Sequence, residues 1–103
     1  MGIEASKELA ALLRAAASQT VSETDFWDQL KWLSDPASDP IAALAYETAT
    51  HYWGNFHEVN LLGFRCKPDP HQVQQGRDEL NLIAEGLDGN WPHAALERRL
   101  KDI

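Results

Sequence analysis

Two Asp-Pro dipeptides, Asp39-Pro40 and Asp69-Pro70, restrict where helices can begin in this chain. Proline has no backbone N–H and is tolerated in the first turn of a helix. An aspartate just before it can accept hydrogen bonds from the free N–H groups of that turn. Each dipeptide therefore predicts the start of a helix. We interpret the pair as local capping and not as duplication of a longer unit.

Apolar residues at helical spacing predict helices over most of the chain. They run from about residue 5 to 17, 23 to 33, 40 to about 54, 70 to about 85, and from about 90–92 to the C-terminal residue. The third helix has two adjacent apolar stripes, wider than the single stripe of a surface helix, and we expect it to be the central helix. The expected fold class is all-α, a single-domain bundle of four to five helices over residues 1–103.

The same periodicity assigns the buried faces of the helices. The predicted inward residues are Phe26, Leu30 and Leu33 in the second helix, Val73, Leu80, Ile83 and Leu87 in the fourth, and Leu96, Leu100 and Ile103 in the fifth. Gly86 or Gly89 should end the fourth helix, because glycine commonly follows the last helical residue.

The segment between the third and fourth helices has no clear periodicity. Gly54-Asn55 can end the third helix, or the helix can continue with a kink through Phe56 and Val59. Residues 61–67 alternate poorly and contain Gly63; a short strand is possible there but has no obvious pairing partner. We therefore interpret them as an extended connector and assign no sheet.

Cysteine content and the N-terminal residues favour the cytoplasm. Cys66 is the only cysteine, so the chain can form neither an internal disulfide nor a multi-cysteine zinc site. Glu4 and Glu8 interrupt the N-terminal segment, which lacks the cationic start of a signal peptide, and no apolar stretch has transmembrane length. We expect a cytoplasmic protein that does not associate with membranes.

Charge and aromatic residues are concentrated in the same part of the chain. The net charge is −7, which argues against direct binding to nucleic acid because phosphates would be repelled. Residues 18–64 hold seven acidic residues and one basic residue, Lys31, together with eight of the nine aromatic residues. This middle segment is where we expect a binding surface for a basic partner.

Trp32 does not share the apolar face of the second helix. On a helical wheel it projects at roughly 240° from Phe26, close to Asp25 at roughly 260° and Asp28 at roughly 200°. A tryptophan among carboxylates on an outward face is typical of a binding hot spot. The competing interpretation is that Trp32 packs under a neighbouring helix, since tryptophan is largely buried on average.

We therefore predict one acidic face, formed by the second helix and the start of the third. Its candidate partner-binding residues are Asp25, Asp28, Trp32, Asp35 and Glu47. No catalytic residue, metal ligand or cofactor is assigned.

Two other groups of residues have side chains that could carry chemistry. Glu47 and His51 are four residues apart on one helical face and could begin a metal site with His57 and Glu58, but no third ligand has a motif spacing. Cys66 lies between two cationic residues that would lower its thiol pKa, yet no nucleophile motif surrounds it. We interpret both groups as structural or incidental.

In size, acidity, low cysteine content and helical layout, with carboxylates beside an outward Trp32, the chain resembles the cytoplasmic immunity proteins that bacteria use against colicin-type or contact-dependent toxins. The resemblance does not extend to a sequence motif. It implies that the acidic face covers a basic toxin, in many cases a nuclease, and that the chain is not an enzyme.

Two alternatives from other classes remain. The chain could be an acidic adaptor or regulatory domain that binds a basic protein without inhibiting it. It could also be a small metal-binding or ligand-binding bundle that uses His51, His57 and Glu47. Association of two copies through the aromatic residues would compete with all three hypotheses, and the oligomeric state stays open.

Overall fold

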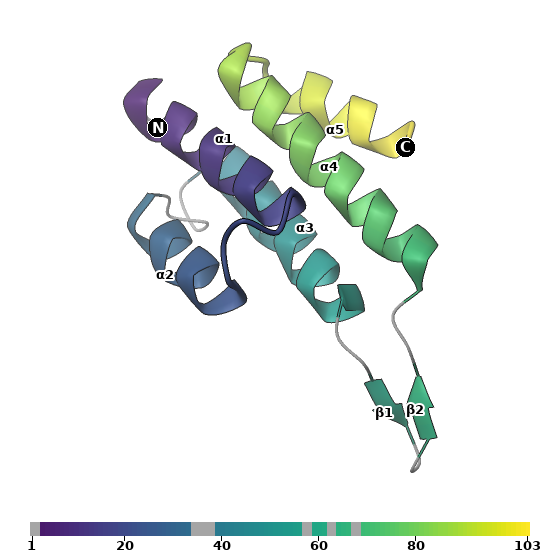
Figure 1. The fold of residues 1–103 in the computed structure, drawn as a ribbon. Helices are drawn as coiled ribbons and strands as arrows, with labels where there is room; N and C mark the ends of the chain where they lie inside the picture. Colours follow the sequence, from purple (N-terminus) through teal and green to yellow (C-terminus); the bar gives the residue numbers. More distant parts are fainter. Residues whose placement is uncertain (1–2, 34–38, 57–58, 62–63, 67–68) are drawn as a thin grey trace.

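Five helices and one two-stranded ribbon form the described part of the chain (Figure 1). The computed structural model describes residues 3–33, 39–56, 59–61, 64–66 and 69–103, and the side chains of residues 6–33, 39–54 and 69–103. The helices are α1 (Ile3–Ala17), α2 (Glu23–Leu33), α3 (Pro40–Phe56), α4 (Pro70–Asp88) and α5 (His93–Lys101). The predicted all-α bundle of four to five helices is confirmed.

Both Asp-Pro dipeptides start a helix as predicted. Asp39 accepts a hydrogen bond from the backbone N–H of Ile41 at 2.9 Å, and Asp69 accepts one from the backbone N–H of His71 at 2.9 Å. Each aspartate thus satisfies a donor that has no partner inside its own helix. These caps fix the first turns of α3 and α4.

The helices pack in two layers around one apolar core. α4 lies against α1, α3 and α5, while α2 lies against α1, and Figure 1 shows α2 and α5 on opposite flanks. Every helix contributes at least one of the largest fully buried side chains, which are Leu9, Leu13, Phe26, Tyr52, Leu80, Ile83 and Leu96. The predicted inward faces of α2 and α4 are confirmed, with Leu33 half-buried at the edge.

The helix that packs closely against the most neighbours is α4. We expected α3 to be the central helix, but α4 contacts three helices, α1, α3 and α5. The aromatic side chains of α3 span the longer distances to its other neighbours: Tyr52 donates a hydrogen bond from its hydroxyl to the Ala16 carbonyl of α1 at 3.0 Å, and Trp53 contacts Phe26 of α2. These long side chains explain why the apolar face of α3 is so wide.

A glycine permits the close contact between α3 and α4. Gly76 faces Tyr52, and a Cβ atom at this position would lie 3.0 Å from the Tyr52 ring and 3.3 Å from its Cα. That is closer than well-packed carbon atoms approach. The small residue therefore sets the distance between the two helices.

The C-terminal part follows the prediction except at its end. Gly86 is buried inside α4, and Gly89 caps the helix, with its N–H donating to the Glu85 carbonyl. In α5 Leu96 is buried and Leu100 half-buried, but Ile103 is 47% exposed beyond the last helical residue. The prediction for Ile103 is wrong because the helix ends before it.

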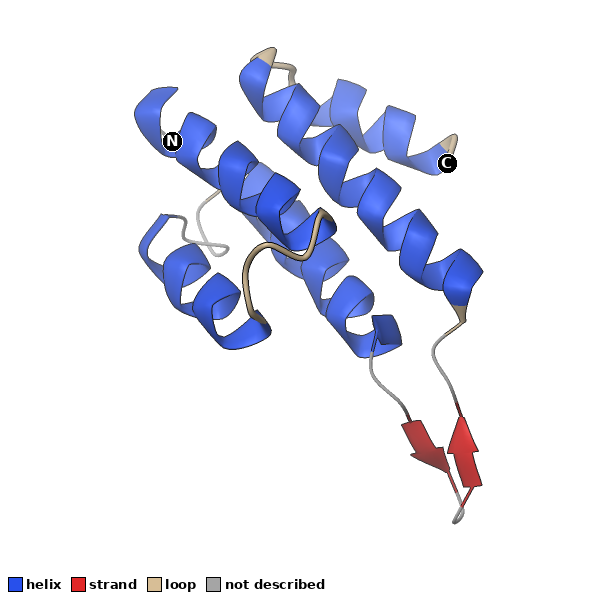
Figure 2. Ribbon diagram, in the orientation of Figure 1, coloured by secondary structure: helices blue, strands red, loops and turns tan. Residues whose placement is uncertain are grey.

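The segment between α3 and α4 contains strands that the sequence analysis did not assign. β1 (Val59–Leu61) pairs antiparallel with β2 (Phe64–Cys66), with Val59 opposite Cys66 (Figure 2). The connector interpretation is therefore wrong for Leu61 and for residues 64–66. Each strand has only three residues, which is too short for period-two alternation to be recognised. α3 ends at Phe56, so the kinked extension through Val59 is also wrong.

Candidate functional site

The outward stripe of α2 carries a tryptophan in solvent. Trp32 is 88% exposed, which contradicts the competing interpretation that it packs under a neighbouring helix. Asp25 and Asp28 are exposed as well, and spacings of three, four and seven residues place all three side chains on one side of the helix. Phe26 and Leu30, on the other side, are buried in the core.

Local interactions explain why α2 begins at this point and presents this side. Ser22 accepts a hydrogen bond from the backbone N–H of Asp25 at 3.2 Å and so caps the helix. Glu23 and Asp25 lie in the first turn, where negative charge is favoured by the helix dipole. The acidic start of α2 is thus compatible with helix stability as well as with partner binding.

The structure does not gather all five predicted residues. Glu47 is exposed on α3, whereas Asp25, Asp28 and Trp32 are exposed on α2. On the side of α3 next to Glu47, Tyr46 contacts Trp27, which projects roughly 130° away from the stripe of Asp25, Asp28 and Trp32. Glu47 therefore belongs to a different helix from that stripe. Asp35 falls outside the described residues.

The other aromatic side chains of the middle segment that the structure describes pack against one another. Trp27 lies 5.1 Å from Phe26 and 5.3 Å from Tyr46, and Trp53 lies 5.0 Å from Tyr52, all between ring centroids. All three pairs have tilted or edge-to-face geometries, which stabilise aromatic contacts, and the pair of Trp27 and Tyr46 joins α2 to α3. Among the side chains that the structure describes, Trp32 is the most exposed large apolar group.

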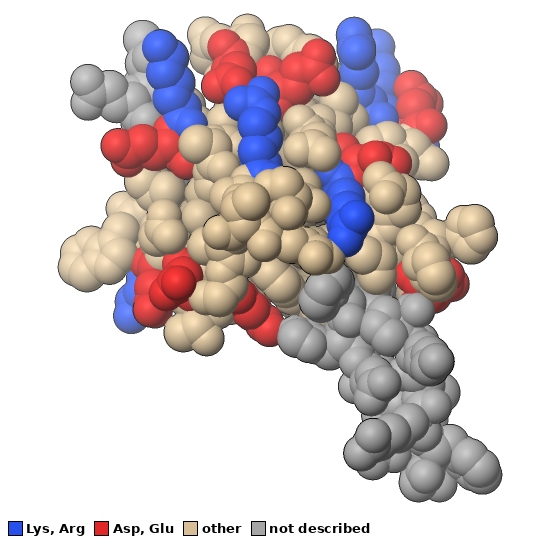
Figure 3. Space-filling model, in the orientation of Figure 1, with Lys and Arg blue, Asp and Glu red and all other residues tan. Residues whose placement is uncertain are grey.

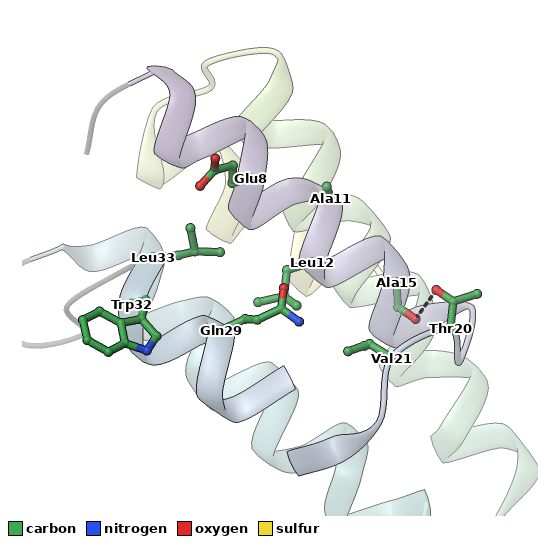
Figure 4. Close-up of a pocket in the computed structure, with 9 residues that line it drawn as sticks. All are labelled: Glu8, Ala11, Leu12, Ala15, Thr20, Val21, Gln29, Trp32 and Leu33. Atoms are coloured by element: carbon green, nitrogen blue, oxygen red, sulfur yellow. Dashed lines mark hydrogen bonds between the residues drawn. The ribbon is translucent and has the colours of Figure 1, made fainter. Parts of the chain in front are cut away.

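A groove between α1 and α2 lies next to this stripe, and sequence reasoning missed it. It has a volume of about 540 Å³. α1 contributes Glu8, Ala11, Leu12 and Ala15, and the turn after α1 contributes Thr20 and Val21. α2 contributes Gln29, Trp32 and Leu33. Figure 4 shows Leu12 and Leu33 extending into the space, with Trp32 at one end.

Small side chains create this groove. Ala11 and Ala15 are one helical turn apart on α1 and leave space where longer side chains would fill it. At the far end from Trp32, Thr20 donates a hydrogen bond from its hydroxyl to the Ala15 carbonyl at 3.3 Å (Figure 4). Ala11 is exposed and Ala15 half-buried, so neither methyl group fills the space between α1 and α2.

The charges beside the groove are of both signs, with more acidic than basic residues. Glu8 is the one ionisable residue that lines it, Asp25 lies one turn from Gln29 on the α2 wall, and Lys7 lies one turn before Ala11 on the α1 wall. Arg14 of α1 is paired with Asp88 of α4, on the other side of α1. Figure 3 shows basic and acidic side chains interleaved along the upper edge of this view, but mostly acidic side chains at the lower left, over α2.

The residues considered for a metal do not form a site in the described part of the structure. Glu47 and His51 are both exposed on α3, whereas His57 and Glu58 are outside the described residues. Within the described ranges, no group of three or more His, Cys, Asp or Glu side chains could hold a metal ion. The backbone of Cys66 belongs to β2, and its side chain lies outside the described set.

A second hollow lies between α3 and α4. It has a volume of about 230 Å³ and is lined by His51, Tyr52, Gln72, Gln75, Gly76 and Glu79. Its ionisable members, His51 and Glu79, come from different helices. This hollow is smaller and more polar than the α1–α2 groove, and it contains none of the residues predicted to bind a partner.

Comparison with protein-family models, with curated proteins and with solved structures finds no match for this chain. A separate finding concerns membranes: across the described ranges, every helix is too short or too polar to cross a bilayer.

Proposed function

We propose that this chain is a cytoplasmic inhibitor that binds and neutralises a basic toxin, in the manner of bacterial immunity proteins. The observation that carries the proposal is the outward stripe of α2, where Trp32 is 88% exposed beside two exposed carboxylates, Asp25 and Asp28. In this proposal the stripe is the centre of the contact surface.

The two kinds of side chain contribute differently to binding. An exposed tryptophan removes a large apolar area from water once a partner covers it, and tryptophan is enriched among residues that dominate binding energy. Carboxylates at the edge of such a contact mainly accelerate association with a basic partner and exclude acidic ones. Trp32 would therefore supply affinity, whereas Asp25 and Asp28 would supply rate and selectivity.

A nuclease toxin fits this surface best. Its active site must attract phosphate and is therefore surrounded by positive charge, which an acidic protein with a net charge of −7 can cover. Inhibition would then be steric and electrostatic, and it would require no catalytic group in the inhibitor. A non-inhibitory adaptor would use the same stripe but would leave the activity of its partner unchanged.

The test begins with affinity capture. The tagged chain is incubated with extract from its native cell, washed at low salt and eluted with a salt step, and the eluted proteins are identified by mass spectrometry. We expect a stoichiometric basic protein that is lost from the Asp25→Asn/Asp28→Asn variant. The matched control is Glu85→Gln/Asp102→Asn, which removes two exposed charges from α4 and the C-terminal end and should retain the protein.

The second step measures activity. The captured protein is assayed for nuclease activity and for toxicity in the absence and presence of the chain. Loss of activity at a one-to-one ratio supports an inhibitor, and unchanged activity supports the adaptor. Equal capture by the wild type and the Asp25→Asn/Asp28→Asn variant would contradict both.

A further inference from the structure

We propose that the groove between α1 and α2 receives one edge of an amphipathic helix that carries Lys or Arg beside its apolar residues and is presented by the basic partner. This inference rests on the proposed function and specifies which structural element of the partner is recognised. Three features of the groove support the inference: its apolar lining, its dimensions and the charges beside it.

The lining has the pattern that accepts apolar side chains. Its floor consists of Ala11, Leu12, Ala15, Val21 and Leu33, which offer no hydrogen-bonding side chain. Apolar side chains that enter such a floor lose contact with water and gain close contacts. At the end of the groove Trp32 can close over an inserted side chain, because its indole is 88% exposed and has room to turn.

The dimensions fit a helix. α2 has 11 residues, which correspond to about 16 Å at 1.5 Å per residue, or about three helical turns. Ala11 and Ala15 lie one turn apart on the α1 wall, and small side chains at this spacing let another helix approach closely. Helix-in-groove recognition uses this geometry, with apolar anchors at intervals of three and four residues.

Two other occupants are less compatible with the same observations. The groove is open to solvent along its side, whereas sites for small molecules bury most of the ligand surface. A second copy of this chain would bring its own Glu8, Asp25 and Asp28 against the same residues, and like charges repel at an interface. A basic helix instead can place positive charges beside Glu8 on the α1 wall and beside Asp25 on the α2 wall.

The test uses a defined probe. A synthetic peptide of about 14 residues, or four turns, contains only Leu and Lys, with Leu at intervals of three and four so that all leucines share one edge. A second peptide has the same composition with the leucines distributed around the helix. Binding of both to the full chain is measured by titration, and the contacted residues are located from amide chemical shifts in NMR spectra.

We expect the patterned peptide to bind at least about tenfold more tightly than the scrambled one, because only its leucines can enter the groove together. Shifts should concentrate at Ala11, Ala15, Gln29 and Leu33. Equal affinity of the two peptides, or shifts on another face, would overturn the inference.

Variants that fill the groove provide the matched comparison. Ala11→Phe places a ring in the groove from an exposed position, and we expect it to lower the affinity for the patterned peptide about tenfold. Ala94→Phe adds the same ring at an exposed position of α5 and should leave the affinity unchanged. If Ala11→Phe does not fold, Gln29→Phe blocks the groove from the α2 wall.

The same titrations separate this inference from the proposed function. Loss of binding in Asp25→Asn/Asp28→Asn but not in either groove-filling variant would leave the acidic stripe in place and overturn the helix-binding groove. If only the groove-filling variants lose peptide binding, the groove is the binding site, but Asp25 and Asp28 do not contribute and recognition through charge is overturned. A dimer of the free chain that disappears in Ala11→Phe, measured by sedimentation, would place a second copy in the groove and also overturn the inference.

Discussion

At the residue scale, Trp32 differs from every other tryptophan of the chain. Trp53 is buried, and Trp27 and Trp91 are half-buried against the core, whereas Trp32 leaves most of its indole in water. A large apolar side chain in this position adds little to the stability of the free chain. Its contribution is therefore expected in a complex.

Replacing Trp32 separates binding from folding. In Trp32→Ala we expect the free energy of unfolding to change by less than about 0.5 kcal/mol. The affinity for the captured basic protein should fall by about 2 kcal/mol or more, which is roughly 30-fold. Urea denaturation and a binding titration measure the two quantities.

The control for this variant is Trp27→Ala. Trp27 packs on Phe26 and Tyr46, and its loss should reduce the free energy of unfolding by about 2 kcal/mol or more. A similar reduction in Trp32→Ala would mean that this side chain serves packing, and the binding interpretation would not hold.

Alanine substitutions at two helical glycines should change the free energy of unfolding in opposite directions. A Cβ at Gly76 meets the Tyr52 ring and backbone, so Gly76→Ala should lower the free energy of unfolding by about 1 kcal/mol despite the better helix propensity of alanine. Gly54 has no atom within 4 Å of such a Cβ, so Gly54→Ala should raise it by about 0.5–1 kcal/mol. Chemical denaturation of both variants tests the pair. A stabilising Gly76→Ala would show that α3 and α4 can separate without loss.

At the element scale, the starts of the helices could be predicted because capping is local. Asp39, Asp69 and Ser22 each act on a backbone group two or three residues away, so their roles are visible in a short stretch of sequence. The ribbon of β1 and β2 could not be predicted, because strands of three residues have no period and their pairing depends on the partner strand.

The candidate site could likewise be predicted where it depends on one helix, but not where it depends on the packing of two. Asp25, Asp28 and Trp32 belong to one helix, so helical spacing alone places them together. Glu47 belongs to α3, and its position relative to the stripe depends on how two helices pack, which spacing within one helix does not determine. The groove escaped prediction for the same reason, because Ala11 and Leu33 meet only after α1 and α2 have packed.

The cap of α4 gives a prediction at this scale. Asp69→Ala removes the acceptor for the His71 N–H, and the free energy of unfolding should fall by about 1 kcal/mol. Asp69→Asn keeps an acceptor oxygen and should stay within a few tenths of the wild type. Thermal or urea unfolding measures both. Equal effects of the two substitutions would show that the charge, and not the hydrogen bond, stabilises this end of α4.

At the scale of the whole molecule, the net charge of −7 acts over distances longer than any contact. In physiological salt this field decays over about 8 Å, so it affects the approach of a partner more than the final complex. Charges of both signs are interleaved along the upper edge of Figure 3, whereas the region over α2 is mainly acidic, and we expect a basic partner to approach that region first.

The salt dependence of association follows from this charge distribution. Between low and roughly threefold physiological ionic strength, the association rate with the captured protein should fall about tenfold or more. Asp25→Asn/Asp28→Asn should flatten this dependence, while Glu85→Gln/Asp102→Asn should retain most of it. Stopped-flow measurements at a series of salt concentrations test the slopes. Identical slopes in the two double variants would mean that the net charge, and not the α2 stripe, guides association.

Photo-crosslinking from the α2 stripe in the native cell tests whether this surface contacts the partner. Thr24→p-benzoylphenylalanine places a reactive group at an exposed position one turn before Asp28, without removing any of the three contact residues and outside the lining of the groove. A matched substitution at Ala94 places it on α5. We expect position 24 to crosslink to one basic protein with toxin activity and position 94 not to do so. Crosslinking of that protein from position 94 and not from position 24 would show that the partner binds another face.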